Sequence, residues 1–209
     1  NGADPVSYGY DNDSLLTQAG ILTLSRRADD GLLAGTTLGS VSDTLNYNSF
    51  GEVTDYSATV GGAARWAVQY THDKLGRITQ KVETVLGVAT TYGYSYDTAG
   101  RLVGVTQTGA SPVSYGYDAN GNRLSKTAGG VTVSGAYDDQ DRLTHDGATT
   151  YAYTANGELR SKTAGGQTTT YQYDVLGNLR HVVLPDGRTL DYMIDAGNRR
   201  IGKKVNGTL

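Results

Sequence analysis

The sequence predicts an all-β protein made of repeated antiparallel β-hairpins, with about two strands in each repeat of roughly 20 residues. Two observations carry this prediction. A motif of the form Tyr-x-Tyr-Asp-x-x-Gly-Arg-Leu returns about nine times along the chain. No segment shows a sustained apolar period of about 3.6 residues, so we expect little or no helix.

The motif fixes the position of most tyrosines. Of the 16 tyrosines, all but Tyr56 and Tyr92 occupy one of its two tyrosine positions, which a bias in composition alone would not produce. We therefore interpret residues 1–209 as a single repeat array. Residues 61–209 hold well-formed copies, whereas residues 1–60 hold degenerate copies in which Gly31 is the expected turn residue. The tyrosines of the best copies are Tyr70, Tyr94, Tyr96, Tyr115, Tyr117, Tyr151, Tyr153, Tyr171 and Tyr173.

These tyrosines are expected to form ladders across the sheet. Alternate residues of a strand point to the same face, so both rings of each copy line one side. Aromatic cross-strand pairs contribute on the order of 0.2–1 kcal/mol each, and a covered phenol hydroxyl needs a hydrogen-bond partner. His72 stands in the second tyrosine position of its copy, so we interpret it as a substituted repeat residue.

The Asp-x-x-Gly segment predicts a tight turn. Aspartate at the first position and glycine at the fourth suit a type I turn, and the carboxylate can accept a hydrogen bond from the N–H two residues on. A glycine with positive φ then closes a three-residue hairpin loop. Thr154 replaces the aspartate in one copy, while Ser14, Asp141 and Asn198 replace the glycine in others. The residues assigned to structural turns are Asp73, Gly76, Asp97, Gly100, Asp118, Gly121, Asp174 and Gly177.

The remaining residues of each repeat complete a hairpin. Pairs such as Gly129-Gly130 and Gly165-Gly166 predict a second turn at the other end. Val, Thr, Tyr and Leu fill strands of roughly five to eight residues, as β-propensity favours. The arginines that follow the turns are expected on a solvated or ion-paired face, because surface ion pairs are common and weak. These arginines are Arg77, Arg101 and Arg142.

The amino-acid composition limits which classes of protein this chain can belong to. Gly accounts for 29 residues and Phe, Trp and Met for one each, so burial must come from Tyr, Leu, Val and Ile along an extended sheet. A net charge of −3 gives no support for nucleic-acid binding. No apolar run of about 18 residues is present, so we expect no membrane-spanning helix. The chain starts within the repeat pattern and without Met, which predicts a piece of a longer protein.

The sequence offers little for catalysis, metals or cofactors, and we expect none of them. The three histidines, His72, His145 and His181, do not share ligand spacing. The recurring aspartates lack the Gly-rich nine-residue period of calcium repeats, so turn capping is the favoured interpretation. No nucleophile-elbow motif is present.

The repeated motif resembles the YD repeat, also called the RHS (rearrangement hotspot) repeat, over nearly the whole chain. The resemblance implies β-hairpins that wind into a spiral sheet, forming part of a β-shell in a large secreted or cell-surface protein, expected to be bacterial. Family members include bacterial polymorphic toxins, the C component of insecticidal toxin complexes, and teneurins. In bacterial members such a shell encloses a C-terminal toxin, but the self-cleaving core that ends those arrays has no match here.

Three functions follow as expectations. The first is a non-enzymatic scaffold whose partners are the remainder of the parent shell and an enclosed C-terminal toxin or effector. The second is an extracellular adhesion module that binds carbohydrate or a cell surface through its tyrosine rows. The third is a self-assembling fibre, since open sheet edges favour pairing. The sequence leaves open which face of the sheet would be inside.

Overall fold

The computed structural model describes residues 5–209 and is all-β, which confirms the predicted fold class. Twenty strands make up a 20-stranded sheet, every described pairing is antiparallel, and residues 5–209 contain no helix. The strands are β1 (Tyr8–Tyr10), β2 (Leu16–Ala19), β3 (Leu22–Arg26), β4 (Leu33–Leu38), β5 (Val41–Tyr47), β6 (Val53–Val60), β7 (Ala63–His72), β8 (Ile78–Val85), β9 (Val88–Tyr96), β10 (Leu102–Gln107), β11 (Ala110–Tyr117), β12 (Arg123–Ala128), β13 (Val131–Tyr137), β14 (Leu143–Asp146), β15 (Thr149–Tyr153), β16 (Leu159–Ala164), β17 (Gln167–Tyr173), β18 (Leu179–Val183), β19 (Thr189–Ile194) and β20 (Arg200–Val205).

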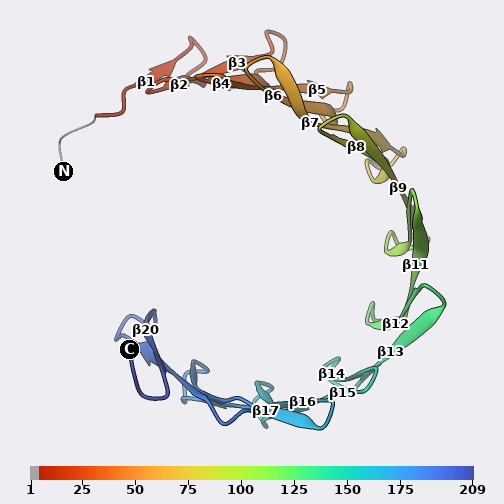
Figure 1. Ribbon diagram of the computed structural model, residues 1–209, viewed down its shortest axis with the longest axis vertical. Helices are drawn as coiled ribbons and strands as arrows, with labels where there is room; N and C mark the ends of the chain where they lie inside the picture. The colour runs from red at the N-terminus through yellow and green to blue at the C-terminus, as the bar shows by residue number, and fades with distance from the viewer. Residues whose placement is uncertain (1–4) are drawn as a thin grey trace. The chain divides into compact units, whose positions relative to one another are not determined.

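The chain divides into two compact units, Asn1–Val113 and Ser114–Leu209. In the first unit, strands β1 to β10 include successive antiparallel neighbours such as β7, β8 and β9. In the second, β12 to β20 pair in the same consecutive way (Figure 1). Each repeat is therefore one hairpin, and neighbouring hairpins also pair with each other.

Two kinds of turn alternate along the chain. The turns that follow the tyrosine strands have positive φ at their fourth position, whether or not it is glycine, as at Gly100 (82°), Asp141 (58°) and Asn198 (63°). The connections at the opposite ends are mostly two-residue loops. Gly129-Gly130 and Gly165-Gly166 have positive φ at both residues, the type I′ geometry that matches the right-handed twist of the flanking strands.

A register shift marks the end of each tyrosine strand. Tyr96 lies opposite Leu102, whereas the preceding residue Ser95 lies opposite Gly104, so Val103 is the extra residue of a bulge. The same shift separates Gln172 from Tyr173 in β17. A bulge of this kind bends the strand locally and increases its twist.

The two faces of the sheet differ in chemistry. Tyr171, Val182 and Leu190 lie opposite one another on successive strands and belong to what we call the tyrosine face. The intervening residues form a polar face, where hydroxyl pairs such as Thr44–Ser57 (2.7 Å) link neighbouring strands. Among the described residues only Val68 and Val182 are buried hydrophobic residues, so burial is confined to the tyrosine face and no globular core forms.

Candidate functional site: turn clamps and the tyrosine face

The repeat turn is held by a clamp between the aspartate and the residue four positions later. Asp73 Oδ1 accepts hydrogen bonds from the N–H groups of Leu75 (2.8 Å) and Arg77 (3.1 Å). Its other oxygen, Oδ2, accepts one from Arg77 Nε at 2.8 Å. The main chain closes the loop, since the Asp73 N–H donates to the Arg77 carbonyl at 2.9 Å. One carboxylate thus satisfies two loop amides and fixes one guanidinium.

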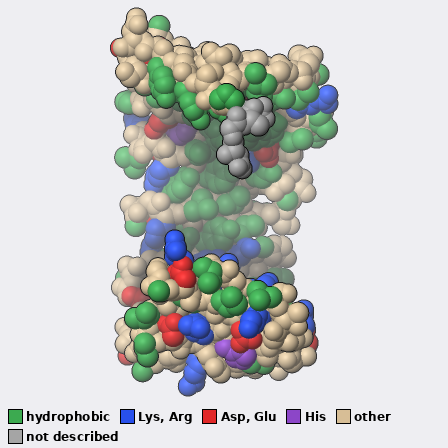
Figure 2. Space-filling model, turned by 90° about the vertical axis from the view of Figure 1, so that its left-hand side faces the viewer, with side chains coloured by type: hydrophobic (Ala, Val, Ile, Leu, Met, Phe, Trp, Pro, Cys, Tyr) green, Lys and Arg blue, Asp and Glu red, His purple; other side chains and the backbone are tan. Residues whose placement is uncertain are grey.

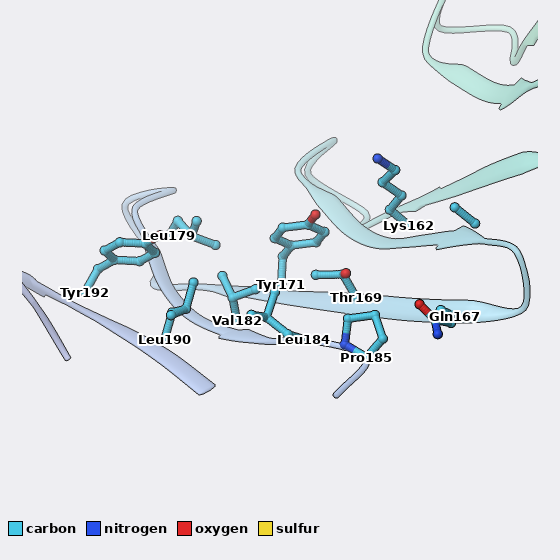
Figure 3. Close-up of a pocket in the computed structure, with 11 residues that line it drawn as sticks. Lys162, Gln167, Thr169, Tyr171, Leu179, Val182, Leu184, Pro185, Leu190 and Tyr192 are labelled. Atoms are coloured by element: carbon cyan, nitrogen blue, oxygen red, sulfur yellow. The ribbon is translucent and has the colours of Figure 1, made fainter. Parts of the chain in front are cut away.

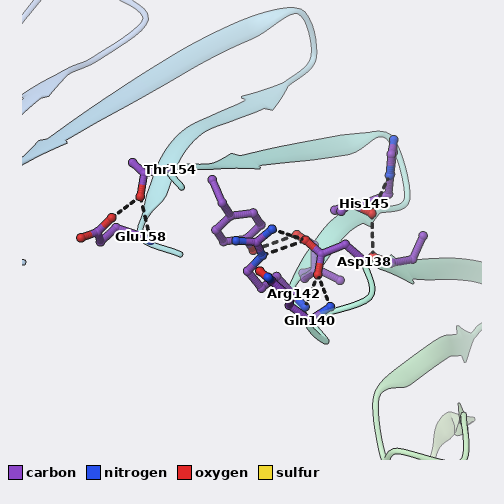
Figure 4. A network of polar contacts seen from close by, with 10 residues as sticks. Asp138, Gln140, Arg142, His145, Thr154 and Glu158 are labelled. Carbon is purple, nitrogen blue, oxygen red and sulfur yellow. Dashed lines mark hydrogen bonds and ion pairs between the residues drawn. The ribbon is translucent and has the colours of Figure 1, made fainter. Parts of the chain in front are cut away.

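The clamp recurs with the same geometry in other copies. Figure 4 shows Asp138 accepting from Gln140 and Arg142, and its Oδ2 lies 2.7 Å from Arg142 Nη2. Where the arginine position holds asparagine, the amide replaces the guanidinium, as in the bond from Asn122 Nδ2 to Asp118 Oδ2 (2.9 Å). Thr154 and Glu158 hydrogen-bond through their side chains in the copy that lacks the aspartate.

These contacts stabilise the charged form of the aspartates. The pKa of Asp73 is lowered, chiefly by the hydrogen bond from the Arg77 side chain. The pKa of Asp97 is also lowered, chiefly by the backbone N–H of Arg101 and then by the Arg101 side chain. The aspartates are therefore ionised acceptors at neutral pH, without a raised pKa of the kind a general acid requires.

The second tyrosine of a repeat joins its hairpin to the preceding one. Its hydroxyl donates to the carbonyl of the residue that opens the previous return strand, as from Tyr96 to Ile78 (2.7 Å) and from Tyr153 to Leu143 (2.8 Å). The ring lies beside the clamp cation of that earlier hairpin. Arg77 is 4.7 Å from the Tyr96 ring centroid.

The structure places the other predicted residues as follows. Gly76, Gly100, Gly121 and Gly177 are at the positive-φ turn position. Asp174 accepts from the N–H groups of Leu176 and Asn178. Tyr94 lies opposite Val105, and its pKa is raised by burial. The remaining predicted tyrosines, which are half-buried, are Tyr70, Tyr115, Tyr117, Tyr151, Tyr171 and Tyr173.

The repeat motif did not predict the contacts of two aromatic residues, Tyr92 and Tyr56, or the specific role of the arginines. Tyr92 lies under Lys81, whose Nζ is 4.1 Å from the ring centroid. Its place two residues before Tyr94 extends the alternation and could have revealed it. Tyr56 packs against Trp66 at a centroid distance of 4.9 Å and donates to Asp43 Oδ2 at 3.3 Å. No repeat signal marks that pair.

A shallow pocket of about 360 Å³ opens on the tyrosine face of the second unit. Figure 3 shows Val182 and Leu190 between the rings of Tyr171 and Tyr192, with Thr169 and Lys162 beyond Tyr171. The floor is apolar and the ring edges carry hydroxyls, so this is a surface for weak stacking and hydrogen bonding.

The described residues contain no group of three or more His, Cys, Asp or Glu side chains that could hold a metal ion. Elsewhere, on the polar face, His181 Nδ1 lies 2.7 Å from Asp191 Oδ1. The search for membrane-spanning helices over the described residues returned none.

Comparisons with known proteins agree with this geometry. The search of curated proteins returned no match. The fold matches the Photorhabdus luminescens Tc holotoxin pore, with 16% sequence identity over 96% of this chain and a TM-score of 0.70. It also matches TcdB2–TccC3 without its hypervariable C-terminal region (16% identity, 96% of this chain, TM-score 0.72) and TcdB2–TccC3–Cdc42 (15%, 97%, 0.68).

In each of these matches the chain spans about 14% of the matched chain's length. The likeness therefore concerns a segment of a much larger molecule. Residues 4–209 match the family described as Teneurin YD-shell, which confirms the resemblance carried by the tyrosine and aspartate motif. The chain belongs to the teneurin YD-shell family.

Proposed function

We propose that this chain is a structural segment of a shell that encloses or presents another part of its parent protein, a C-terminal toxin or effector. The strongest support is that the recurrent side chains of the repeat all have structural roles. The aspartates cap turns, the arginines clamp them, and the tyrosines join hairpins. None of these roles leaves a group for catalysis, so the segment acts as a scaffold in place of an enzyme.

The two faces of the sheet suit such a role. Val68 and Val182, the buried hydrophobic residues among those described, lie on the tyrosine face opposite Tyr56 and Tyr171, and the polar face carries hydroxyl pairs such as Ser42–Thr59 (2.9 Å). A wall with one apolar and one polar side can separate a contained segment from solvent. The parent is then a secreted or cell-surface protein of bacterial origin, in line with the Tc toxin proteins whose fold it shares.

Protease accessibility tests the proposal on the full-length parent protein. One variant carries a cleavage site for a specific protease in the C-terminal segment. A matched variant carries the same site in the turn at Val175–Leu176, whose side chains are 98% and 73% exposed. We expect cleavage in the turn and resistance in the C-terminal segment until the protein is unfolded with urea. Equal cleavage rates in the native protein would rule out enclosure.

The pocket between Tyr171 and Tyr192 supports carbohydrate binding as a second candidate function. Exposed aromatic rings can stack on sugar rings, and the Thr169 hydroxyl and the Lys162 ammonium are suitable hydrogen-bond donors. A glycan array probed with the wild-type chain and with Tyr171→Ala tests this. Binding that survives the substitution, or no binding at all, would exclude the pocket as a sugar site.

A further inference from the structure

The turn that begins at Asn48 differs from the other repeat turns in the charge of its clamp position, the fourth residue after the start of the turn. This position holds Glu52, whereas it holds arginine in copies such as Asp195–Arg199, whose side chains are 2.8 Å apart. Figure 2 shows acidic and basic side chains gathered over the C-terminal strands, where that pair lies. Within residues 5–209 Glu52 forms no ion pair, so this copy has an uncompensated acid where the repeat has its cation.

The two carboxylate oxygens of Glu52 have different surroundings. Asn48 Nδ2 donates to Oε2 at 2.6 Å, which holds the side chain in place. A Cβ added at Gly76 would meet Oε1, so this oxygen points toward the next turn, as Arg77 Nη1 points toward Gly100. Oε1 accepts no hydrogen bond within the part of the chain that the structure describes. Glu52 thus presents one fixed and open acceptor.

The aromatic residue that faces this clamp position is also altered. In the copy of Arg77, the guanidinium lies over the ring of Tyr96 at 4.7 Å. The corresponding pair in this copy is Glu52 and His72, because His72 stands in the second tyrosine position of the next hairpin. The His72 ring makes no hydrogen bond to any described residue, and its ring contact is with Tyr70 at a centroid distance of 6.3 Å. This copy therefore lacks both the guanidinium and the phenol of the repeat.

A hollow of about 410 Å³ opens at this place in the first unit. Its lining includes Asn48, Phe50, Glu52, Tyr70, His72 and Lys74. Phe50 is the only phenylalanine of the chain and is 86% exposed, so it adds little burial to the fold. Asp73 also lines the hollow, but its carboxylate is bound to Arg77 at 2.7 Å. Lys74 is exposed and forms no ion pair with a described residue, so the fixed open charge of the hollow is that of Glu52.

We propose that this hollow binds an alkylguanidinium group, carried either by a small molecule or by an arginine side chain of a partner. The guanidinium donates to Glu52 Oε1, and its plane and alkyl chain pack on the rings of Phe50 and Tyr70. A guanidinium is planar, weakly hydrated and stacks on aromatic faces, whereas an ammonium is compact and strongly hydrated. The bound group supplies the cation that this copy lacks. The proposal is independent of what the scaffold encloses.

Titration of the isotope-labelled full chain with ethylguanidinium, followed by NMR, tests the proposal. We expect the amide signals of residues 48–52 and 70–74 to shift, with a dissociation constant on the order of millimolar for so small a ligand. Ethylammonium carries the same charge and should bind more weakly by on the order of threefold. Equal binding of the two would overturn the assignment to guanidinium. N-acetylarginine amide separates the two sources: tighter binding than ethylguanidinium indicates an arginine side chain of a polypeptide, and equal or weaker binding indicates a small molecule.

Matched variants place the binding in the hollow. Glu52→Gln removes the charge and should weaken binding about tenfold, because a hydrogen bond to a charged acceptor is lost. Phe50→Ala removes an exposed ring and should weaken binding by on the order of threefold.

Two controls should bind as the wild type does. Glu158→Gln makes the same charge change at a clamp position where the tyrosine is kept, since the pKa of Tyr173 is raised by burial and then by the charges of Tyr171 and Glu158. Leu176→Ala truncates a side chain that is 73% exposed at the turn position of Phe50. Unchanged amide signals away from the hollow verify folding. No binding by the wild type, or binding that survives both Glu52→Gln and Phe50→Ala, would overturn the proposal.

Discussion

The Tyr96 hydroxyl donates to the Ile78 carbonyl at 2.7 Å and thereby joins two successive hairpins. Ile78 opens the return strand of one repeat and Tyr96 ends the outgoing strand of the next. A carbonyl next to a bulge is released from regular ladder pairing, and the phenol satisfies it. The same bond from Tyr47 to Leu33 (2.8 Å) shows that it is a property of the repeat.

Removing this hydroxyl should weaken the array. We expect Tyr96→Phe to lower the free energy of unfolding by about 1 kcal/mol, because the Ile78 carbonyl loses its partner while the ring remains. Tyr10→Phe is the control, since the Tyr10 side chain is 61% exposed at the start of the array. Urea unfolding followed by circular dichroism measures both. An equal loss in the two variants would contradict this role for the hydroxyl.

The aspartate clamps predict a loss of stability in acid. The pKa of Asp97 is below its usual 3.8, chiefly because the Arg101 N–H donates to the carboxylate. The charged form is thus favoured in the folded state, so its contribution is complete above pH 3.8 and is lost as the pH falls through the lowered folded-state pKa.

Asp97→Asn should therefore lower the melting temperature at pH 7 more than at pH 2.5. Thermal melts of the wild type and the variant across this range provide the measurement. A difference between the two proteins that is constant with pH would show that the Asp97 charge does not contribute.

The positive-φ turn position should resist side chains. Gly100 has a φ of 82°. A Cβ added at this residue would lie 3.7 Å from Arg77 Nη1, which is an ordinary van der Waals contact. The cost of Gly100→Ala is therefore conformational, about 1 kcal/mol. Gly100→Asn is the matched control, because asparagine tolerates positive φ, as Asn198 does at the same turn position with a φ of 63°. Chemical denaturation should show a clearly smaller loss for the control.

The stability gained by burial should be concentrated at the few buried positions of the tyrosine face. Val68 is 1% exposed, so Val68→Ala should cost about 2 kcal/mol from lost burial and the cavity left behind. Val88, on β9 of the same unit, is 71% exposed, and Val88→Ala should change the free energy of unfolding by less than about 0.5 kcal/mol. Similar losses in the two variants would show that burial is not concentrated at Val68.

The sequence by itself determined the elements of this protein. Tyr-x-Tyr alternation gives strands, and Asp-x-x-Gly gives turns whose fourth residue has positive φ even at Ser14 and Asp141. These are local preferences, set by steric limits on φ and by hydrogen bonds between residues at most four apart, so a single copy of the motif is enough to state them.

Only the tertiary structure decided what joins one hairpin to the next. The clamp of Arg77 on Asp73 lies within one turn, but its stacking on Tyr96 depends on the register between β8 and β9. The bond from Asn122 to Asp141 spans 19 residues, and the Tyr56–Trp66 pair follows no repeat. A periodic pattern records which residue fills each position, whereas contacts between repeats require strands to be placed side by side in a defined register.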